Sequence, residues 1–321
     1  CPGSLPTAQI GFNGLILDFL EKRILFVTGK GGVGKSTVAI ALGIRAAMEG
    51  KRTIVVEVAS TENASRVFRQ ADVGFKEVEM RNNLWAISID PEESMREYVL
   101  LQLKVKAMRD LLFRSRMFTY LAAATPGLNE LVTIGKIWEL ALEDRKLKHG
   151  RKYDLVIVDS PATGHGISFL QSPRTFANIA RVGPIHSQAR QLQDMINDHD
   201  HTGSVIVSLP EEMPVNETAN LEAELTGDVN ISVDRVIMNA LYPDRYTDTD
   251  LKAIRKLGKS ENDEVRAASK AAISQCVRTA SQREQLERLE SMVSAPITTL
   301  PYIFKPEIDL SSARQLAEEL S

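Results

Sequence analysis

Short apolar runs and longer amphipathic stretches alternate along most of the chain. The apolar runs are rich in valine and isoleucine, which is typical of parallel strands buried on both faces of a sheet. They predict strands at 23–27, 53–58, 84–89, 153–159, 204–209, 235–239 and 297–300. Helical spacing of apolar positions predicts helices at 37–48, 91–152, 168–202, from 214 onward, at 248–292 and after Asp309. This alternation predicts an α/β fold with a doubly wound, mostly parallel sheet.

The longest interval between strands, at about 91–152, predicts a large helical insertion, to which part of 168–202 also contributes. Residues 1–21 form a mixed lead-in. No linker, repeat or low-complexity tract interrupts 22–321, so we expect one domain with a helical subdomain. Within the insertion, one apolar stripe is either core or dimer contact, or part of a groove for a client. The stripe consists of Tyr98, Leu101, Val105, Met108 and Leu112.

Composition and charge exclude several classes of protein. The chain has 321 residues, of which 43% are hydrophobic and 25% charged, as in an ordinary globular protein. A net charge of −3 gives no reason to expect nucleic-acid binding. Cys1 and Cys276 are too few for a disulfide framework or a four-cysteine zinc site within one chain. No apolar run approaches the about 18 residues of a membrane span, so we expect a cytoplasmic protein, with peripheral membrane association left open.

The stretch from Gly29 to Ser36 carries the most specific chemistry in the chain. It fits the P-loop pattern of glycine, four residues and Gly-Lys-Ser/Thr, between a predicted strand and a predicted helix. Its glycines let backbone N–H groups turn toward phosphate oxygens, and the helix N-terminus adds a partial positive charge. Lys35 is expected to reach the β- and γ-phosphates of ATP, and the Ser36 hydroxyl to hold Mg²⁺. The expected nucleotide contacts are Gly29, Gly31, Gly32, Val33, Gly34, Lys35, Ser36 and Thr37.

Two further charged residues extend this site. Asp159 ends an apolar strand, where P-loop proteins carry an acid that binds Mg²⁺ through water or orients the attacking water. Lys30 directly follows the first glycine, a position at which most P-loops have no lysine. We expect it to reach a nucleotide held by a facing subunit, as an arginine finger does, and the alternative is a solvated loop lysine. The candidate catalytic residues are thus Lys30, Lys35 and Asp159, and the candidate metal ligands are Ser36 and Asp159.

Two other motifs allow more than one interpretation. Asn239 ends the strand at 235–239, where its carboxamide either pairs with the edge of an adenine base or forms a turn. The segment Asp198-His199-Asp200-His201 has the composition of a metal site, but its place before a strand favours a polar loop tip.

The P-loop resembles that of the ParA, MinD and arsenite-pump (ArsA) ATPases, which reads Gly-Lys-Gly-Gly-Val-Gly-Lys-Ser/Thr. The resemblance is closest to the branch that contains the arsenite pump and the ATPases that target tail-anchored proteins. It covers about 22–305, nearly the whole chain. Besides the P-loop, the similar segments are 159–165 (its switch II), 125–130 (its helical region), 236–241 (its adenine strand) and 300–302 (its adenine-flanking loop).

This resemblance implies an ATPase that uses ATP and Mg²⁺. It also implies a homodimer, or a heterodimer with a paralogue, in which Lys30 acts across the interface. Base contacts are implied for Asn239, Pro301 and Tyr302.

The chain departs from the family pattern in two places. The family's switch I carries an aspartate, the expected water-activating residue, where this chain has Ala59. Glu57 and Glu62 are candidate replacements, although neither has the expected spacing. Cys276 stands alone, so the family's CxxC zinc clip and its arsenite-binding cysteine cluster are missing, and we expect no zinc.

The sequence therefore favours an ATP-driven dimeric switch whose nucleotide state controls binding of a hydrophobic protein segment or a membrane-protein partner. An alternative is a nucleotide-binding regulatory or scaffold subunit with weak catalysis, which needs a paralogous partner. The cysteine count disfavours a subunit of a metalloid efflux pump.

Overall fold

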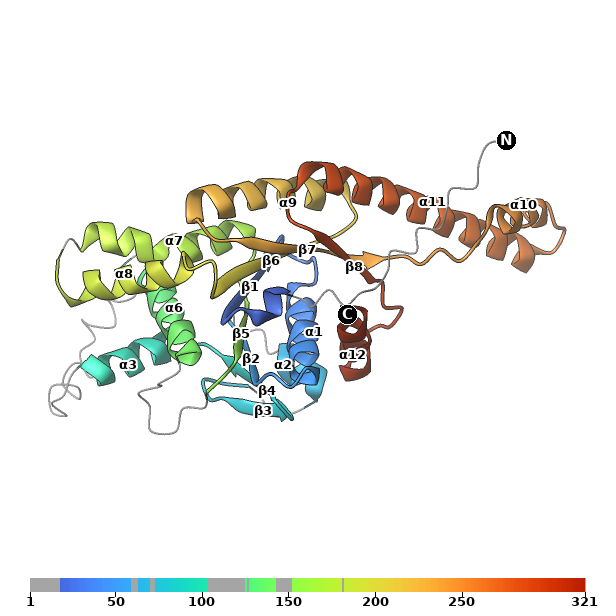
Figure 1. Ribbon diagram of the computed structural model, residues 1–321. Helices are drawn as coiled ribbons and strands as arrows, with labels where there is room; N and C mark the ends of the chain where they lie inside the picture. The colour runs from blue at the N-terminus through green and yellow to red at the C-terminus, as the bar shows by residue number, and fades with distance from the viewer. Residues whose placement is uncertain are drawn as a thin grey trace.

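An eight-stranded sheet forms the centre of the protein in the computed structural model (Figure 1). The structure describes residues 18–58, 63–69, 73–102, 125, 127–142, 152–180 and 182–320. The strand order is β3-β4-β2-β5-β1-β6-β7-β8, and all neighbours are parallel except β3 and β4. This confirms the predicted α/β class with a mostly parallel sheet. The strands are β1 (Ile24–Gly29), β2 (Thr53–Glu57), β3 (Val78–Arg81), β4 (Leu84–Ser88), β5 (Leu155–Asp159), β6 (Thr202–Ser208), β7 (Val233–Leu241) and β8 (Ile297–Pro301).

The four central strands follow directly from their apolar sequences. Every residue of β1, β2, β5 and β6 is buried, as expected for parallel strands covered on both faces. The apolar pattern does not predict β3, in which only Met80 is buried. This edge strand pairs with β4 through a turn at Asn83, whose φ of 62° lies in the left-handed region that asparagine tolerates.

Helices cover both faces of the sheet, and each face has its own apolar core. On one face, α1, α2 and α12 pack over the sheet. On the other face, α6, α7, α8, α9 and the end of α11 form a second core (Figure 1). These helices are α1 (Lys35–Met48), α2 (Asn63–Phe68), α6 (Leu128–Ala141), α7 (Thr163–Ile179), α8 (Pro184–Ile196), α9 (Glu212–Glu224), α11 (Asp263–Met292) and α12 (Leu310–Glu319).

The predicted helical insertion contains α3 (Pro91–Gln102) and α6. Lys136 of α6 is 7% exposed and pairs with Glu97 of α3 at 2.7 Å and with Glu139 at 3.2 Å, so a buried cation links the two helices. Residues 103–124, 126 and 143–151 lie outside the described part of the chain. The same holds for Val105 and Met108, so the predicted apolar stripe stays a prediction.

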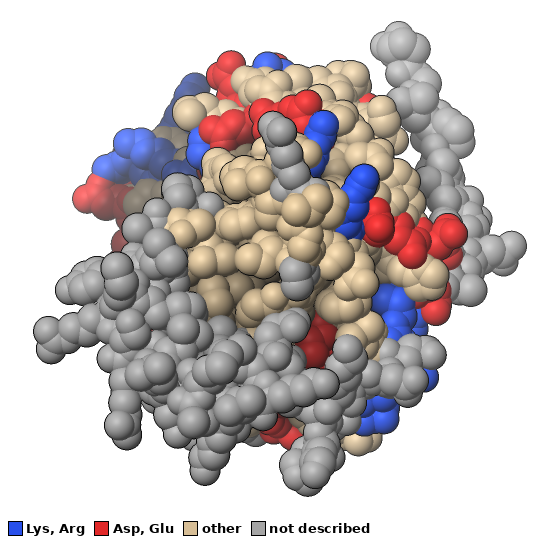
Figure 2. Space-filling view, turned by 90° about the vertical axis from the view of Figure 1, so that its left-hand side faces the viewer, with Lys and Arg blue, Asp and Glu red and all other residues tan. Residues whose placement is uncertain are grey.

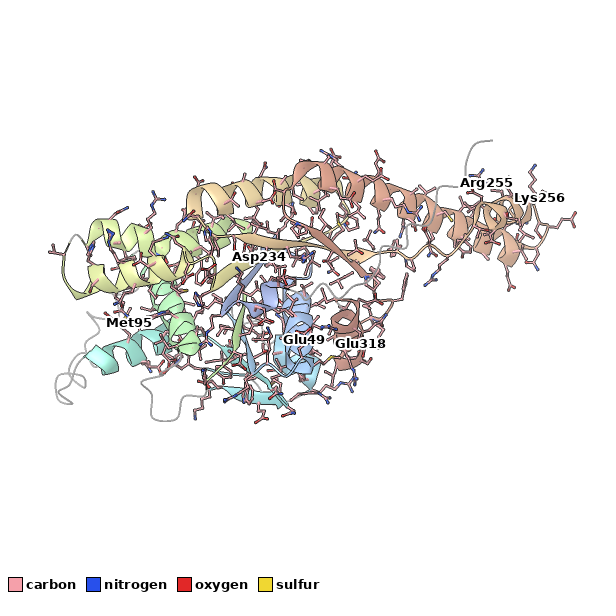
Figure 3. The ribbon with its side chains drawn as sticks, in the orientation of Figure 1. Glu49, Met95, Asp234, Arg255, Lys256 and Glu318 are labelled. Carbon is pink, nitrogen blue, oxygen red and sulfur yellow. The ribbon has the colours of Figure 1, made fainter. Side chains whose placement is uncertain are left out.

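A helical arm extends from the sheet near the carboxyl ends of β7 and β8 (Figure 1). It consists of α10 (Asp248–Leu257) and the N-terminal part of the 30-residue helix α11. No residue of α10 is buried. Arg255 and Lys256 lie at the far end of this arm (Figure 3). The other end of α11 returns to the body, where Leu289 is fully buried.

The part of the lead-in that the structure describes is a short 3-10 turn, Asp18–Glu21, whose Phe19 and Leu20 are buried against the first core. Among the helices within the described segments, none is both long enough and apolar enough to span a bilayer.

Candidate functional site

The P-loop connects β1 to α1 and depends on glycine at two points. Gly29 has a φ of 140° and Gly34 a φ of 94°, conformations that side chains disfavour. A Cβ on Gly29 would overlap the carbonyl oxygen of Val207, and one on Gly34 would overlap the carboxamide of Asn239. Gly31 and Gly32 lie exposed at the loop tip, Val33 is buried, and Thr37 lies in the first turn of α1. The loop thus brings backbone N–H groups and a helix N-terminus together, the arrangement that binds phosphate.

Lys35 is the first residue of α1, and its ammonium group turns back over the loop. Its Nζ donates a hydrogen bond to the carbonyl oxygen of Lys30 at 2.9 Å. Burial lowers the pKa of Lys35, and the nearby Asp159 carboxylate opposes that shift. The cation is therefore partly desolvated and has one carboxylate nearby, so a phosphate group in the loop would stabilise its charged form.

Asp159 lies beside the P-loop because β5 is the neighbour of β1, with Val27 and Asp159 at the same register. It is 8% exposed, and the Ser36 hydroxyl donates a hydrogen bond to its carboxylate. Burial raises the pKa of Asp159, whereas the Ser36 hydrogen bond and the Lys35 charge lower it. The structure thus brings together the two residues that the sequence nominates as magnesium ligands, and both present oxygen atoms, the donors that Mg²⁺ prefers.

Lys30 has a different partner. Its Nζ donates to Glu217 Oε1 of α9 at 2.5 Å, with 30% of the lysine side chain and 37% of the glutamate side chain exposed. Glu217 could not be predicted from the sequence, because 187 residues separate it from Lys30 and nothing in its local pattern marks it. Lys35 therefore bonds within its own loop, whereas Lys30 is held at the surface by α9.

Glu57 provides a second acid at the same edge of the sheet. It ends β2 at the register of Asp159 and is 1% exposed. Its Oε1 accepts the N–H of Ala64 in α2 at 2.9 Å, and its Oε2 has no hydrogen-bond partner among the residues that the structure describes. Burial raises the pKa of Glu57, and the negative charge of Asp159 raises it further. Ala59 and Glu62, the other switch I positions discussed above, lie outside the described residues.

Asn239 joins β7 to the P-loop. Its Nδ2 donates to the carbonyl oxygen of Val33 at 2.9 Å. A carboxamide carries two N–H groups and an acceptor oxygen, so within the described part of the chain one N–H and Oδ1 stay available for a ligand. The turn interpretation of Asn239 does not account for this contact over 206 residues of sequence.

Pro301 and Tyr302 lie at the end of the next strand. The backbone N–H of Tyr302 donates to the carbonyl oxygen of Leu241 at 2.8 Å, which keeps this segment beside the end of β7. The Tyr302 ring is 40% exposed and packs edge-on against Tyr242 and Phe304, with centroids 5.0 and 4.8 Å apart. A partly exposed aromatic cluster therefore follows Asn239 along the same edge of the sheet.

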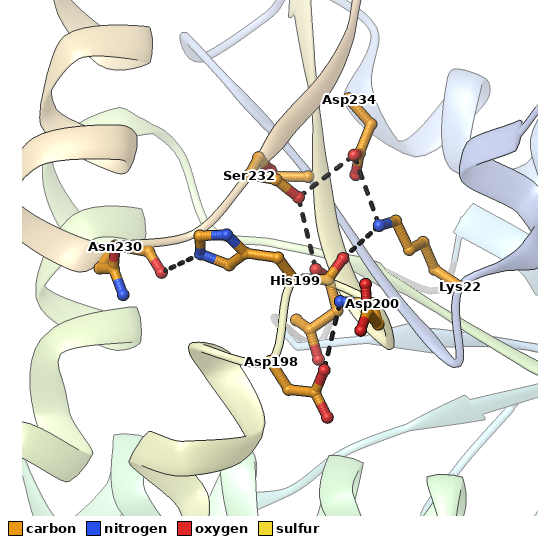
Figure 4. Close-up of polar contacts among 9 residues, drawn as sticks. Lys22, Asp198, His199, Asp200, Asn230, Ser232 and Asp234 are labelled. Carbon is orange, nitrogen blue, oxygen red and sulfur yellow. Dashed lines mark hydrogen bonds and ion pairs between the residues drawn. The ribbon is translucent and has the colours of Figure 1, made fainter.

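The histidine-rich segment lies at the opposite edge, between α8 and β6 (Figure 4). His201 Nδ1 lies 2.9 Å from Asp198 Oδ2, and His199 Nε2 lies 2.9 Å from the carbonyl oxygen of Asn230. Lys22 bonds the carbonyl oxygen of His199 and lies 3.7 Å from Asp234. These contacts lie within the segment or join it to Lys22 and Asn230, as expected for a polar turn. Nowhere in the described ranges do three or more His, Cys, Asp or Glu side chains form a metal-binding group.

Comparison with known proteins shows the family to which the chain belongs. The sequence model of the anion-transporting ATPase family (ArsA ATPase) matches residues 22–183 and 176–275. ATPase BagA of Mycobacterium tuberculosis is 27% identical over 322 residues, which cover 93% of this chain and 92% of that protein. ATPase GET3 of Kluyveromyces lactis is 25% identical over 76% of this chain and 79% of its own.

A putative arsenical pump-driving ATPase of Halobacterium salinarum is 26% identical over 94% of this chain but only 45% of its own length. This chain, with its single P-loop, therefore corresponds to a little under half of that relative. The matched residues of the family model include the whole P-loop, β5 and β7. The chain belongs to the anion-transporting (ArsA) ATPase family, and it is an ATPase.

Proposed function

We propose that this ATPase is a dimeric switch, in which two subunits close around Mg²⁺-bound ATP and in which closure controls the binding of a hydrophobic client or membrane partner. Lys35 binds the phosphates within its own subunit, and Lys30 crosses to the nucleotide of the facing subunit. Ser36 and Asp159 hold Mg²⁺, which withdraws charge from the phosphates when it is bound. Asn239 and Tyr302 form the base end of the site.

The orientation of Lys30 is the observation that carries this proposal. A lysine that served its own nucleotide would turn into the loop, as Lys35 does when it donates to the carbonyl oxygen of Lys30. The Lys30 ammonium instead pairs with Glu217 on α9, at a distance of 2.5 Å. Since both side chains are about one-third exposed, this ion pair contributes on the order of 0–1 kcal/mol and is easily exchanged for a stronger anionic partner.

The client part of the proposal is supported by an apolar corner between α7 and α8. Ile179, Val182 and Ile185 are 69%, 85% and 50% exposed. Figure 2 shows this end of the molecule, where much of the described surface is uncharged. Exposed apolar side chains close together in the sequence and in the fold are typical of surfaces that bind another molecule. The helices α7 and α8, which carry this corner, pack with α6 and β5 in the second core through their buried residues.

Mixing two inactive variants tests whether Lys30 acts across a dimer. We expect Lys30→Ala and Lys35→Ala each to lose turnover. A mixed dimer has one complete site, made of Lys35 from one subunit and Lys30 from the other. An equimolar mixture is therefore expected to recover about a quarter of wild-type turnover, since half of the randomly formed dimers are mixed and each has one of two sites complete.

The control replaces Lys35→Ala with the double variant Lys30→Ala/Lys35→Ala. Its mixed dimers with Lys30→Ala contain no complete site, so turnover stays at the level of the single variants. Absence of recovery in the first mixture, with mixed dimers verified by differently tagged subunits, would reject the action of Lys30 in trans.

A further inference from the structure

The strand that carries Asn239 changes its conformation immediately after this residue. Ala240 has a φ of 63°, in the left-handed region that residues with a side chain disfavour. The pairing of β7 with β8 shifts register between Met238 and Leu241, which marks a bulge. The pairing of β7 with β6 ends at Met238. On the β6 side, the backbone after Met238 therefore lacks a strand partner, whereas on the β8 side Leu241 still pairs with Pro301 beyond the bulge.

Gln282 of α11 supplies the missing partner. Its Oε1 accepts the backbone N–H of Tyr242 at 2.8 Å, and its Nε2 donates to the carbonyl oxygen of Ala240 at 3.3 Å. A carboxamide presents the same donor and acceptor as a peptide group, so this one side chain takes the place of a neighbouring strand. The Ala240 carbonyl lies within the bulge and the Tyr242 N–H directly after it, so Gln282 holds the backbone on the carboxyl side of the strained residue.

A second contact connects the same part of α11 to the segment after β7. Arg283, the next residue of the helix, forms an ion pair with Asp244. More than half of each side chain is exposed, so this pair adds little stability by itself. It shows, however, that two consecutive residues of α11, Gln282 and Arg283, contact the segment 240–244.

The strained residue connects Gln282 to the nucleotide site. Ala240 directly follows Asn239, whose Nδ2 bonds the carbonyl oxygen of Val33 in the P-loop. The Asn239 carboxamide also fills the space beside Gly34, where a Cβ would overlap its Nδ2. A change in the backbone conformation of Ala240 would therefore rotate the Asn239 carboxamide.

We propose that Gln282 is a positioning residue for base recognition: it holds the bulge at Ala240 and thereby orients the Asn239 carboxamide toward adenine. This inference rests on the proposed role of Asn239 as a base contact. Gln282 acts through the backbone and does not itself contact the nucleotide. Its substitution is therefore expected to change the preference for one base over another and to leave the maximal rate of ATP hydrolysis unchanged.

Kinetics with ATP and ITP on the full-length protein tests the proposal. ITP has an oxygen in place of the N6 amine of ATP, so it lacks the donor that Oδ1 of Asn239 would accept. Gln282→Leu keeps the side-chain size and removes both hydrogen bonds. We expect its KM for ATP to rise about fivefold, with kcat within about twofold and the KM for ITP nearly unchanged, since one oriented hydrogen bond is at stake. Gln282→Glu keeps the acceptor for the Tyr242 N–H and is expected to lie between wild type and Gln282→Leu.

Gln285→Leu serves as the matched control. Gln285 lies on the same helix, and its Oε1 has no hydrogen-bond partner in the described part of the chain. Its substitution should leave the ratio of the two KM values unchanged. Equal changes in KM for ATP and ITP in both Gln282 variants, or a lower melting temperature with unchanged KM values, would show that Gln282 is only a structural brace.

Asn239→Ala separates failure of this inference from failure of the proposed base contact. If Asn239→Ala leaves the ATP-to-ITP preference intact, Asn239 does not read the base and both ideas fail. If Asn239→Ala abolishes the preference while both Gln282 variants retain it, the base contact stands and the positioning role is overturned. The third outcome is that Asn239→Ala and Gln282→Leu each abolish the preference for ATP over ITP. If the Gln282→Leu/Asn239→Ala double variant then has the same KM for ATP as Asn239→Ala, Gln282 acts through Asn239 as proposed.

Discussion

Glu57 and Asp159 end adjacent parallel strands at the same register, so two buried carboxyl groups lie side by side at the carboxyl edge of the sheet. Asp159 has the Ser36 hydroxyl and the Lys35 ammonium to stabilise its charge. The Glu57 carboxylate accepts hydrogen bonds from backbone N–H groups at the start of α2, and its Oε2 has no hydrogen-bond partner among the described residues. Burial raises the pKa of both groups, and the charge of Asp159 adds to the shift of Glu57.

This raised pKa predicts a pH-dependent effect of Glu57→Gln on stability. The folded protein binds the Glu57 proton more tightly than the unfolded chain, so ionisation of Glu57 lowers stability as the pH rises above the ordinary value of 4.5. Glutamine keeps an oxygen for the N–H of Ala64 and carries no charge. We expect Glu57→Gln to raise the Tm of the nucleotide-free protein by about 2 °C at pH 8, and by progressively less as the pH falls toward 4.5.

Thermal unfolding between pH 5 and 8 measures this effect. Glu290→Gln, at an exposed position of α11, is the control and should leave the Tm unchanged across this range. A lower Tm for Glu57→Gln at pH 8 would mean that ionised Glu57 stabilises the fold, contrary to the expectation.

Removal of the Asp159 charge is expected to affect turnover more than nucleotide affinity. Asp159→Asn keeps the shape of the side chain but weakens the interaction with the Ser36 hydroxyl and with Mg²⁺. We expect kcat to fall about 100-fold or more, with a higher Mg²⁺ concentration needed for half-maximal rate. Asp198→Asn, at the opposite edge of the sheet, should change neither quantity. Unchanged Mg²⁺ dependence in Asp159→Asn would remove Asp159 from the metal site.

Gly34 and Gly50 offer a matched pair for the geometry of the P-loop. Both have positive φ values, 94° and 88°, so alanine is strained at either position by about 1 kcal/mol. Only at Gly34 would the new Cβ overlap another group, the Asn239 carboxamide, whereas no atom lies within 4 Å at Gly50. We expect both variants to lose similar stability and only Gly34→Ala to lose ATP binding, by about tenfold or more in Kd. Equal ATP affinity of the two variants in a titration with fluorescent ATP would contradict this account.

The apolar corner between α7 and α8 predicts a loss of client binding without a loss of ATPase activity. Val182→Glu places a charge at a position that is 85% exposed, so folding should be unaffected. We expect the Kd for a fluorescent apolar helical peptide to rise about tenfold, because a charge must be desolvated on binding. Leu257→Glu, on the arm and 51% exposed, is the control. Equal peptide affinity of both variants and the wild type would place the client surface elsewhere.

Much of the site could be predicted because it is local in sequence. The P-loop is one continuous stretch, and Asp159 directly ends an apolar strand, so pattern alone places both at the carboxyl edge of a parallel sheet. Asn239 ends a similar predicted strand, although β7 continues to Leu241 in the structure, and its position beside the P-loop follows from the same rule. What the pattern could not supply was its hydrogen bond to Val33, which depends on the order of β1, β6 and β7.

The residues that could not be predicted from the sequence form contacts with residues far away along the chain. Glu217 is one of several acidic residues on α9, and only the fold shows that it faces Lys30. Gln282 lies in a long polar helix where glutamine is unremarkable, and the left-handed φ of Ala240 has no signal in a residue that usually favours helices. The edge strand β3 was missed for a related reason, because a half-exposed strand with one buried residue lacks an apolar run.

The arm formed by α10 and α11 is long compared with the contact at Gln282 that joins it to the end of β7. Between Gln282 and Asp263 the helix rises about 28 Å at 1.5 Å per residue. A rotation of about 10° around the contact at Gln282 would therefore move the far end by roughly 5 Å, a distance given by that length. A small displacement of the strained backbone at Ala240 would therefore appear at α10 as a movement of several ångströms.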